Sequence, residues 1–160
     1  MISRNNMQKL LAVCVLLAWV FAAGTTQKAG ATQKNIDQMK AEADKAEGGH
    51  QAKLCAEVAQ QLVPVADQQF TQGNVEEAQK TVQEILNYAA KARDASIKSR
   101  GKMKETEIVL RATQRKLEAV KRTISAEDRP PLDAVEKKLE QFRQDILNEM
   151  FAPPKKKGSQ

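Results

Sequence analysis

Aromatic residues are scarce in this sequence, and so are histidine and cysteine. Phe, Trp and Tyr together make up 4% of the 160 residues, while Ala, Gln, Glu, Lys and Leu dominate. This composition favours helices that pack through small and aliphatic side chains over β-sheets. At this length we expect a single domain with one modest core. The predicted fold class is therefore all-α.

The motifs of common enzyme classes are also missing. The single histidine, His50, belongs to no recognisable Ser-His-Asp order and to no His-Glu-x-x-His run, and no glycine-rich phosphate loop follows a strand. Together, His50 and Cys55 offer ligands for zinc or copper, but a spacing of five places them far apart around a helix. We therefore predict a non-enzymatic protein without catalytic, cofactor-binding or metal-binding residues.

Cysteine provides no internal disulfide framework. Cys14 lies in the N-terminal apolar segment, so Cys55 would be the one cysteine left after removal of that segment. We expect Cys55 to be a small buried thiol, and a disulfide-linked dimer is the alternative.

The N-terminal segment has the three-part order of a secretory signal peptide. Arg4 and Lys9 precede an apolar run over residues 10–23, and a stretch of small and polar residues follows over residues 24–31. As a helix the run spans about 21 Å, which is short of the roughly 30 Å hydrocarbon core of a bilayer. We predict that residues 1–31 are a cleavable signal peptide.

Two positions fit cleavage, because both leave small residues where signal peptidase requires them. Cleavage after Ala31 is favoured, and cleavage after Gly24 is the alternative. Lipidation at Cys14 is disfavoured, because the preceding Val13 is too bulky for a lipobox. The expected destination is the periplasm or the extracellular space.

The positive charge of the chain is concentrated at its ends. The net charge of +6 falls to +3 without the three basic residues of the signal peptide, and the run Lys155 to Lys157 accounts for the remainder. A nearly neutral body argues against a dedicated polyanion-binding surface, so we predict no nucleic-acid partner. Residues 152–160 are predicted to form a disordered basic tail that contacts anionic surfaces weakly.

Apolar periodicity predicts the first helices of the exported part. Residues 32–49 indicate a weak helix and linker that end at a glycine pair, and residues 50–151 indicate a helical domain. Between Gln51 and Thr71, apolar residues recur every three or four positions. They predict a helix that continues past Pro64 with a bend one turn before it.

A helical hairpin is predicted after this helix. Gly73 fits a left-handed helix stop, and Asn74 with Glu77 fits the start of the next helix. The segment from Gly73 to Ala78 resembles the mid-repeat turn of a tetratricopeptide unit, over roughly residues 62–85. The resemblance implies a partner-binding groove. Gln69 stands where such units carry an aromatic residue, and no second copy is visible.

The longest pattern in the chain runs from residue 75 to residue 124. Steps of three and four alternate without a slip, which is a heptad register. This register favours one continuous helix of about 50 residues, and two helices folded back at residues 99–102 are the alternative. The seam positions are Val75, Ala78, Val82, Ile85, Ala89, Ala92, Ser96, Ser99, Met103, Thr106, Leu110, Thr113, Leu117, Val120 and Ile124.

A last helix is predicted to begin near Pro131, with Asp128 as its cap. Its apolar stripe consists of Leu132, Val135, Leu139, Phe142, Ile146 and Met150. Charged residues that alternate in sign elsewhere on the helices indicate solvated outer faces, as in Glu105, Glu107, Arg111, Arg115 and Glu118.

These features predict an exported interaction or structural protein of the cell envelope. Long amphipathic faces would dock a protein partner or a second copy of the chain. Small seam residues such as Ala78, Ala89 and Ala92 permit close helix approach, while Leu110 and Leu117 supply apolar contact area. The alternative is a periplasmic chaperone-like or tetratricopeptide-like module that binds a ligand or partner.

Overall fold

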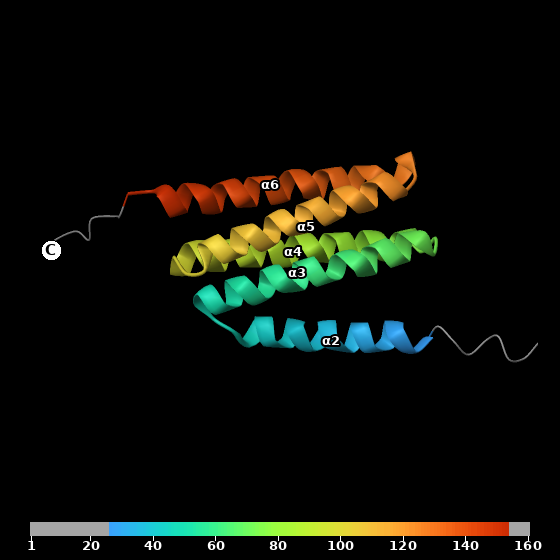
Figure 1. The fold of residues 1–160 in the computed structure, drawn as a ribbon, viewed down its shortest axis with the longest axis horizontal. Coiled ribbons are helices and arrows are strands. Elements are labelled where there is room, and N and C mark those ends of the chain that lie inside the picture. Colours follow the sequence, from blue (N-terminus) through green and yellow to red (C-terminus); the bar gives the residue numbers. More distant parts are fainter. Residues whose placement is uncertain (1–25, 154–160) are drawn as a thin grey trace, which may run out of the picture. The chain divides into compact units, whose positions relative to one another are not determined.

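The computed structural model describes residues 26–153, and no strand occurs within this range (Figure 1). The all-α prediction is thereby confirmed. Nearly all of the predicted signal peptide lies outside the described residues, as does the basic run Lys155 to Lys157. The described elements are α2 (Thr26–Lys45), α3 (Gly48–Thr71), α4 (Val75–Ser99), α5 (Met103–Thr123), the short 3₁₀ helix η1 (Ala126–Asp128) and α6 (Arg129–Phe151).

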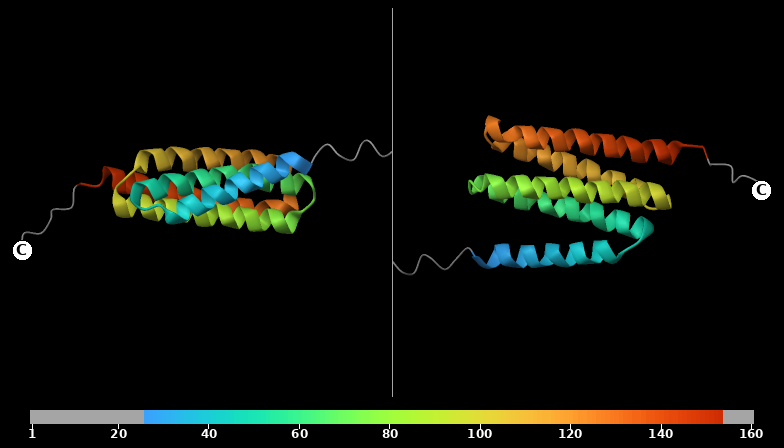
Figure 2. Two further views of the ribbon diagram at one scale, coloured as in Figure 1. Left: turned by 90° about the horizontal axis from the view of Figure 1, so that it is seen from below. Right: turned by 180° about the vertical axis from the view of Figure 1, so that it is seen from behind.

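Helices α3 to α6 form a four-helix bundle within the compact unit that begins at Ile36. Successive helices run in opposite directions (Figure 1 and Figure 2). The main packed pairs are α3 with α4, α4 with α6, α6 with α5, and α5 with α3. The chain therefore makes two antiparallel hairpins, α3–α4 and α5–α6, which pack side by side.

The continuous helix predicted over residues 75–124 is wrong, and the fold-back alternative is right. α4 ends at Ser99, and α5 begins at Met103. Between them, Arg100 and Lys102 have φ angles of 50° and 56°, in the left-handed region that interrupts a helix. The chain reverses direction within these three residues.

A contact between two glycines fixes the position of this turn. Gly101 lies against Gly49, which is in the first turn of α3. A Cβ atom added to Gly49 would lie 2.9 Å from the carbonyl carbon of Gly101, closer than real Cβ contacts. Only glycine permits such an approach of two backbones. The periodicity of the sequence carries no information on this contact.

The heptad register nevertheless identifies the correct buried faces. Ser99 is the one exposed seam residue, and Val75, Met103 and Ile124 are half-buried. The other seam positions of α4 and α5 are buried, which places the stripes of both helices in one core. In α6, all the predicted stripe residues are buried except Met150, which is half-buried.

The predicted helix ends differ in one detail. Gly73 has a φ of 77° and closes α3, as expected, with its N–H donating to the carbonyl of Phe70 at 3.0 Å. Asn74 and Asp128 occupy N-cap positions, but neither side chain caps its helix. Instead, the Asp128 carboxylate accepts a hydrogen bond from the Ser125 hydroxyl at 2.6 Å.

Helix α3 is buried on two stripes, whereas α5 and α6 are each buried on one. It continues through Pro64, as predicted. Two stripes are needed because α3 packs against both α4 and α5 and lies near the end of α2. Its buried residues are Ala52, Cys55, Ala56, Val58, Ala59, Leu62, Val63, Ala66 and Phe70.

Candidate functional site

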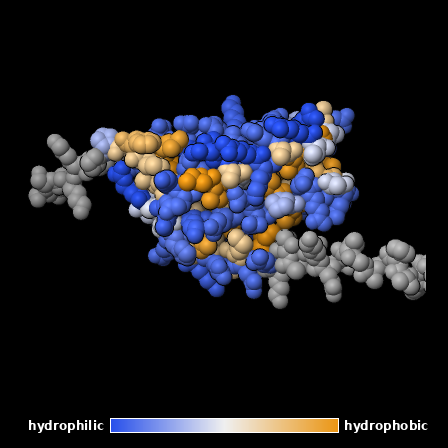
Figure 3. Space-filling model, in the orientation of Figure 1, coloured by the Kyte–Doolittle hydropathy of each residue, from blue (hydrophilic) through white to orange (hydrophobic). Residues whose placement is uncertain are grey.

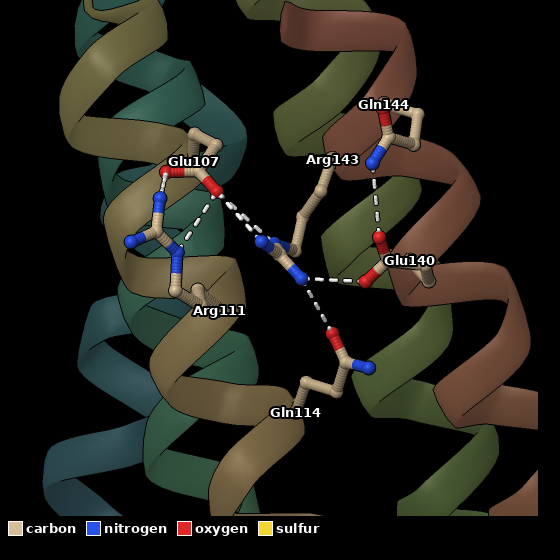
Figure 4. A network of polar contacts seen from close by, with 6 residues as sticks. All are labelled: Glu107, Arg111, Gln114, Glu140, Arg143 and Gln144. Atoms are coloured by element: carbon tan, nitrogen blue, oxygen red, sulfur yellow. Dashed lines mark hydrogen bonds and ion pairs between the residues drawn. The ribbon is translucent and has the colours of Figure 1, made fainter.

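A network of charged side chains joins α5 to α6 (Figure 4). The carboxylate of Glu107, 3% exposed, accepts hydrogen bonds from Arg143 Nε at 3.1 Å and Arg143 Nη2 at 3.0 Å. It also accepts hydrogen bonds from Arg111, one turn further along α5. The solvated position predicted for Glu107 is therefore wrong. Its companions Glu105, Arg111 and Arg115 are exposed, and Glu118 is half-buried.

Arg143 on α6 is the centre of this network. In addition to its bonds to Glu107, Nη1 donates to Gln114 Oε1 at 2.9 Å and to Glu140 Oε2 at 2.5 Å. Gln144 donates to the other oxygen of Glu140 at 3.0 Å. All three guanidinium nitrogens of Arg143 thus donate hydrogen bonds. Two of the acceptor residues, Glu107 and Gln114, lie on the neighbouring helix α5.

The electrostatic surroundings keep Glu107 ionised. Burial alone would raise the pKa of Glu107, but the hydrogen bonds from Arg111 and Arg143 outweigh burial and lower its pKa below the usual range. A carboxylate that is already paired with two guanidinium groups is a poor general base. The arrangement is suited to holding two helices together.

A second charged link joins the same helices nearer to their connection. The Lys121 ammonium group donates to Asp133 Oδ1 at 2.8 Å and also to the buried carboxylate of Glu136. These hydrogen bonds, to Asp133 first and to Glu136 second, raise the pKa of Lys121. In chain order the charge on each helix is thus negative then positive, Glu107 before Lys121 on α5 and Glu136 before Arg143 on α6. Opposite charges meet because the two helices are antiparallel. A shifted or parallel arrangement would bring like charges together.

The sequence contained a signal for both links. Glu107, Lys121, Glu136 and Arg143 each directly follow a buried residue of an apolar stripe. Such flanking positions are where charges on neighbouring helices meet. The pairing itself could not be read without knowing that α5 and α6 are antiparallel neighbours, because each charge has many possible partners in the sequence.

A groove of about 450 Å³ lies between α4 and α6. Its floor includes the buried or half-buried side chains of Val82, Leu86 and Val135, and its rim is mainly polar, with Ala134 as an exposed apolar residue. The polar rim residues are Gln79, Gln83, Lys137, Lys138 and Gln141, all exposed. The face drawn in Figure 3 likewise shows separate apolar patches within a mainly hydrophilic surface.

A smaller groove of about 300 Å³ lies between α3 and α5. Val63, Pro64 and Val120 line it, and Asp67 and Lys116 also face it. It carries one side chain of each charge, so it lacks the uniformly positive rim of the α4/α6 groove. We therefore regard the α4/α6 groove as the better candidate for binding a partner.

His50 and Cys55 do not form a site. His50 is exposed at the start of α3, whereas Cys55 is fully buried. Burial is the main reason that the pKa of the Cys55 thiol is raised to about 11. A protonated, inaccessible thiol does not react readily, so this state of the chain disfavours a disulfide-linked dimer through Cys55.

Residues 35–153 contain no cluster of three or more His, Cys, Asp or Glu side chains able to hold a metal ion. None of the helices in the described part is both long enough and apolar enough to cross a bilayer. Comparison of the chain with protein-family models, curated proteins and solved structures finds no significant match.

Proposed function

We propose that this chain is an exported, non-enzymatic interaction protein that docks an acidic amphipathic helix of a partner protein in the α4/α6 groove. The observation that carries the proposal is the combination of an apolar floor with a positively charged rim at Lys137 and Lys138. A groove between helices is a common place for such a helix, whose apolar face enters it while its charges meet the rim.

The charges at the rim support this choice. Within the described residues, neither Lys137 nor Lys138 forms an ion pair, in contrast to Lys121 on the neighbouring helix. Their charge is therefore available to a partner. Exposed glutamines beside them offer hydrogen bonds without adding charge. This combination favours an acidic segment over a basic one.

Export is supported by the sequence of the N-terminal segment. A basic start, a short apolar run and a small-residue end are the order of a signal peptide. The N-terminus of the processed chain tests this part. Sequencing should begin at Thr32, or at Thr25 for the alternative cleavage position, and a processed chain that retains residue 10 would contradict export.

Site-specific photo-crosslinking tests the docking site. A photoreactive amino acid at Gln83, in the groove, should give an adduct with one protein, and the same probe at exposed Gln61 on α3 should not. The variant Lys137→Glu/Lys138→Glu should weaken the adduct. Lys104→Glu/Arg115→Glu makes the same charge change on α5 and should leave the adduct unchanged.

Two results would overturn the docking proposal. Equal adducts from Gln83 and Gln61 would show that the groove is not selective. An adduct with the mass of two copies would identify self-association in place of a partner.

The chaperone-like alternative receives less support. A protein that holds unfolded clients needs a broad exposed apolar face. In the described part of the chain, the exposed large apolar side chains are Ile108 on α5 and Phe151 at the end of α6, which lie on different helices and form no such face.

A further inference from the structure

The second half of α2 covers a face of the α3–α4 hairpin. Ile36 is 2% exposed and Ala43 is 0% exposed, and a spacing of seven places both on one side of the helix. Tyr88 on α4 is also buried, one heptad after Thr81 and outside the main stripe of that helix. Thr81 in this second stripe donates to Gln69 on α3 at 2.7 Å, whereas Tyr88 lies between Glu84 and Lys91, the two residues that pair with α2.

Two ion pairs set the direction in which α2 lies. Lys40 Nζ is 2.7 Å from Glu84 Oε1, and Asp44 Oδ1 is 2.8 Å from Lys91 Nζ. Lys91 also lies over the ring of Tyr88, 4.9 Å from its centroid. A reversed helix would bring like charges together. Because the Asp44 and Lys91 side chains are each 51% exposed, this pair contributes specificity more than stability.

The attachment of α2 is short and weak. Two residues, Ala46 and Glu47, separate it from α3, and Gly48 follows in the left-handed region with a φ of 59°. Two fully buried apolar side chains hold residues 36–45, whereas α3 contributes a double stripe to the core. A glycine hinge beside a lightly held helix is the arrangement from which domain exchange arises.

We propose that segment Ile36–Lys45 is an exchangeable helix, which docks on the α3–α4 face of its own copy or on the same face of a second copy. The second copy presents Glu84 and Lys91 in the same order, so every contact of the closed chain is available between copies. The exchanged form is a dimer in which each copy supplies the other's α2. This face is separate from the α4/α6 groove, and the inference does not depend on the function proposed there.

Cys55 is a built-in reporter of this docking. Its thiol is fully buried, and after desolvation the groups that influence its pKa are Lys91 on α4 and Asp44 on α2. The thiol therefore lies close to the point where α2 meets the hairpin. Undocking of α2 should expose it to a thiol reagent.

The experiment uses the full chain with Cys14→Ser, so that Cys55 is the only thiol. In Ile36→Glu/Ala43→Glu, labelling of Cys55 by a disulfide reagent should accelerate about tenfold or more, because local opening exposes the site. The control Gln38→Glu/Ala41→Glu adds the same charges on the exposed side of α2 and should label at the original rate.

A synthetic peptide of residues 32–47 then tests docking between molecules. Added to Ile36→Glu/Ala43→Glu, it should slow Cys55 labelling towards the original rate. The same peptide with Asp44→Lys should bind about two to five times more weakly, which is the range for an exposed ion pair. When the chain also carries Lys91→Asp, the peptide with Asp44→Lys should bind more tightly than the unchanged peptide. Failure of the peptide to protect Cys55, in a variant whose circular dichroism stays helical, would overturn the proposal.

Light scattering tests the dimer itself. After refolding at high concentration, the chain with intact α2 should contain a species of twice the monomer mass, and Ile36→Glu/Ala43→Glu should not. A chain that stays monomeric would contradict exchange between copies. So would a dimer that persists in the variant, because it would have to use another surface.

Discussion

The two hairpins of the bundle are built from different chemistry. In α3–α4 the buried stripes consist mainly of alanine and valine, with one cysteine, and no charged side chain of these two helices is buried. In α5–α6 leucine is the commonest residue of the stripes, with threonine and valine next, and two carboxylates, Glu107 and Glu136, are buried beside them. Small residues let α3 and α4 approach closely, whereas the longer side chains of α5 and α6 reach across to form ion pairs.

This difference separates stability from specificity. Burial of apolar area stabilises a fold but does not favour one orientation of the helices over another. In a buried ion pair, the cost of desolvation offsets most of the electrostatic attraction, but arrangements that leave the charges unpaired are strongly disfavoured. The charge order on α5 and α6 fits their antiparallel register and no other. We therefore expect the stability of the bundle to fall most when a large buried side chain of α3–α4 is shortened, or when one charge of an ion pair in α5–α6 is removed.

The largest effect is expected from a cavity in the first hairpin. Ile85 is fully buried on α4, so Ile85→Ala should lower the free energy of unfolding by about 2–5 kcal/mol at any pH between 5 and 8. Leu86→Ala, at the half-buried neighbouring position, is the control and should cost clearly less. Urea denaturation followed by circular dichroism measures both, and equal losses would contradict the placement of the core.

The second-largest loss of stability is expected when one charge of the Glu107–Arg143 pair is removed. Arg143→Ala leaves Glu107 buried with Arg111 as its one remaining cation, and should cost about 3 kcal/mol at neutral pH. The double variant Glu107→Met/Arg143→Met removes both charges and should recover most of the loss. If the double variant is as unstable as Arg143→Ala, the network stabilises the bundle and does not only specify it.

A smaller loss is expected from the glycine contact that joins the two hairpins. In Gly101→Ala the new methyl group meets the Gly49 backbone at 3.1 Å, and overpacking of this kind costs about 1–3 kcal/mol. Gly73→Ala is the comparison, because no atom lies within 4 Å of its new Cβ and only the left-handed φ opposes it, at about 1 kcal/mol. Thermal unfolding ranks the two, and an equal or larger loss for Gly73→Ala would contradict the proposed role of the contact.

The smallest effect on stability is expected from a change to acidic pH. Because its folded pKa is lowered, Glu107 contributes stability above its unfolded pKa of about 4.3, and this contribution is lost as pH falls through the folded pKa. Stability of the wild-type chain should therefore decline below about pH 4.3 more steeply than that of Glu107→Gln. Parallel slopes in urea titrations at several acidic pH values would show that the Glu107 pairing is not responsible.

The sequence was sufficient for the all-α class and for the faces that the helices bury, but not for the division of residues 75–124 into α4 and α5. Ala78, Val82, Leu110 and Leu117 were assigned to one seam from spacing alone, and all four are buried. The candidate groove was beyond such reasoning, because it forms between α4 and α6, which are not consecutive in the chain. Glu107 was misplaced for a related reason, since its burial depends on Arg143, a residue on another helix.

The division between sequence and tertiary structure follows from the range of the forces involved. Periodicity, helix propensity and turn glycines act within a few residues, so the sequence by itself determined the all-α class, the buried stripes and the Gly73 turn. The same register is compatible with a straight or a folded chain, because both keep the stripe on one face. Only the tertiary structure decided for the fold-back at Arg100 to Lys102, since it brings Gly101 against Gly49 and closes four helices around one core.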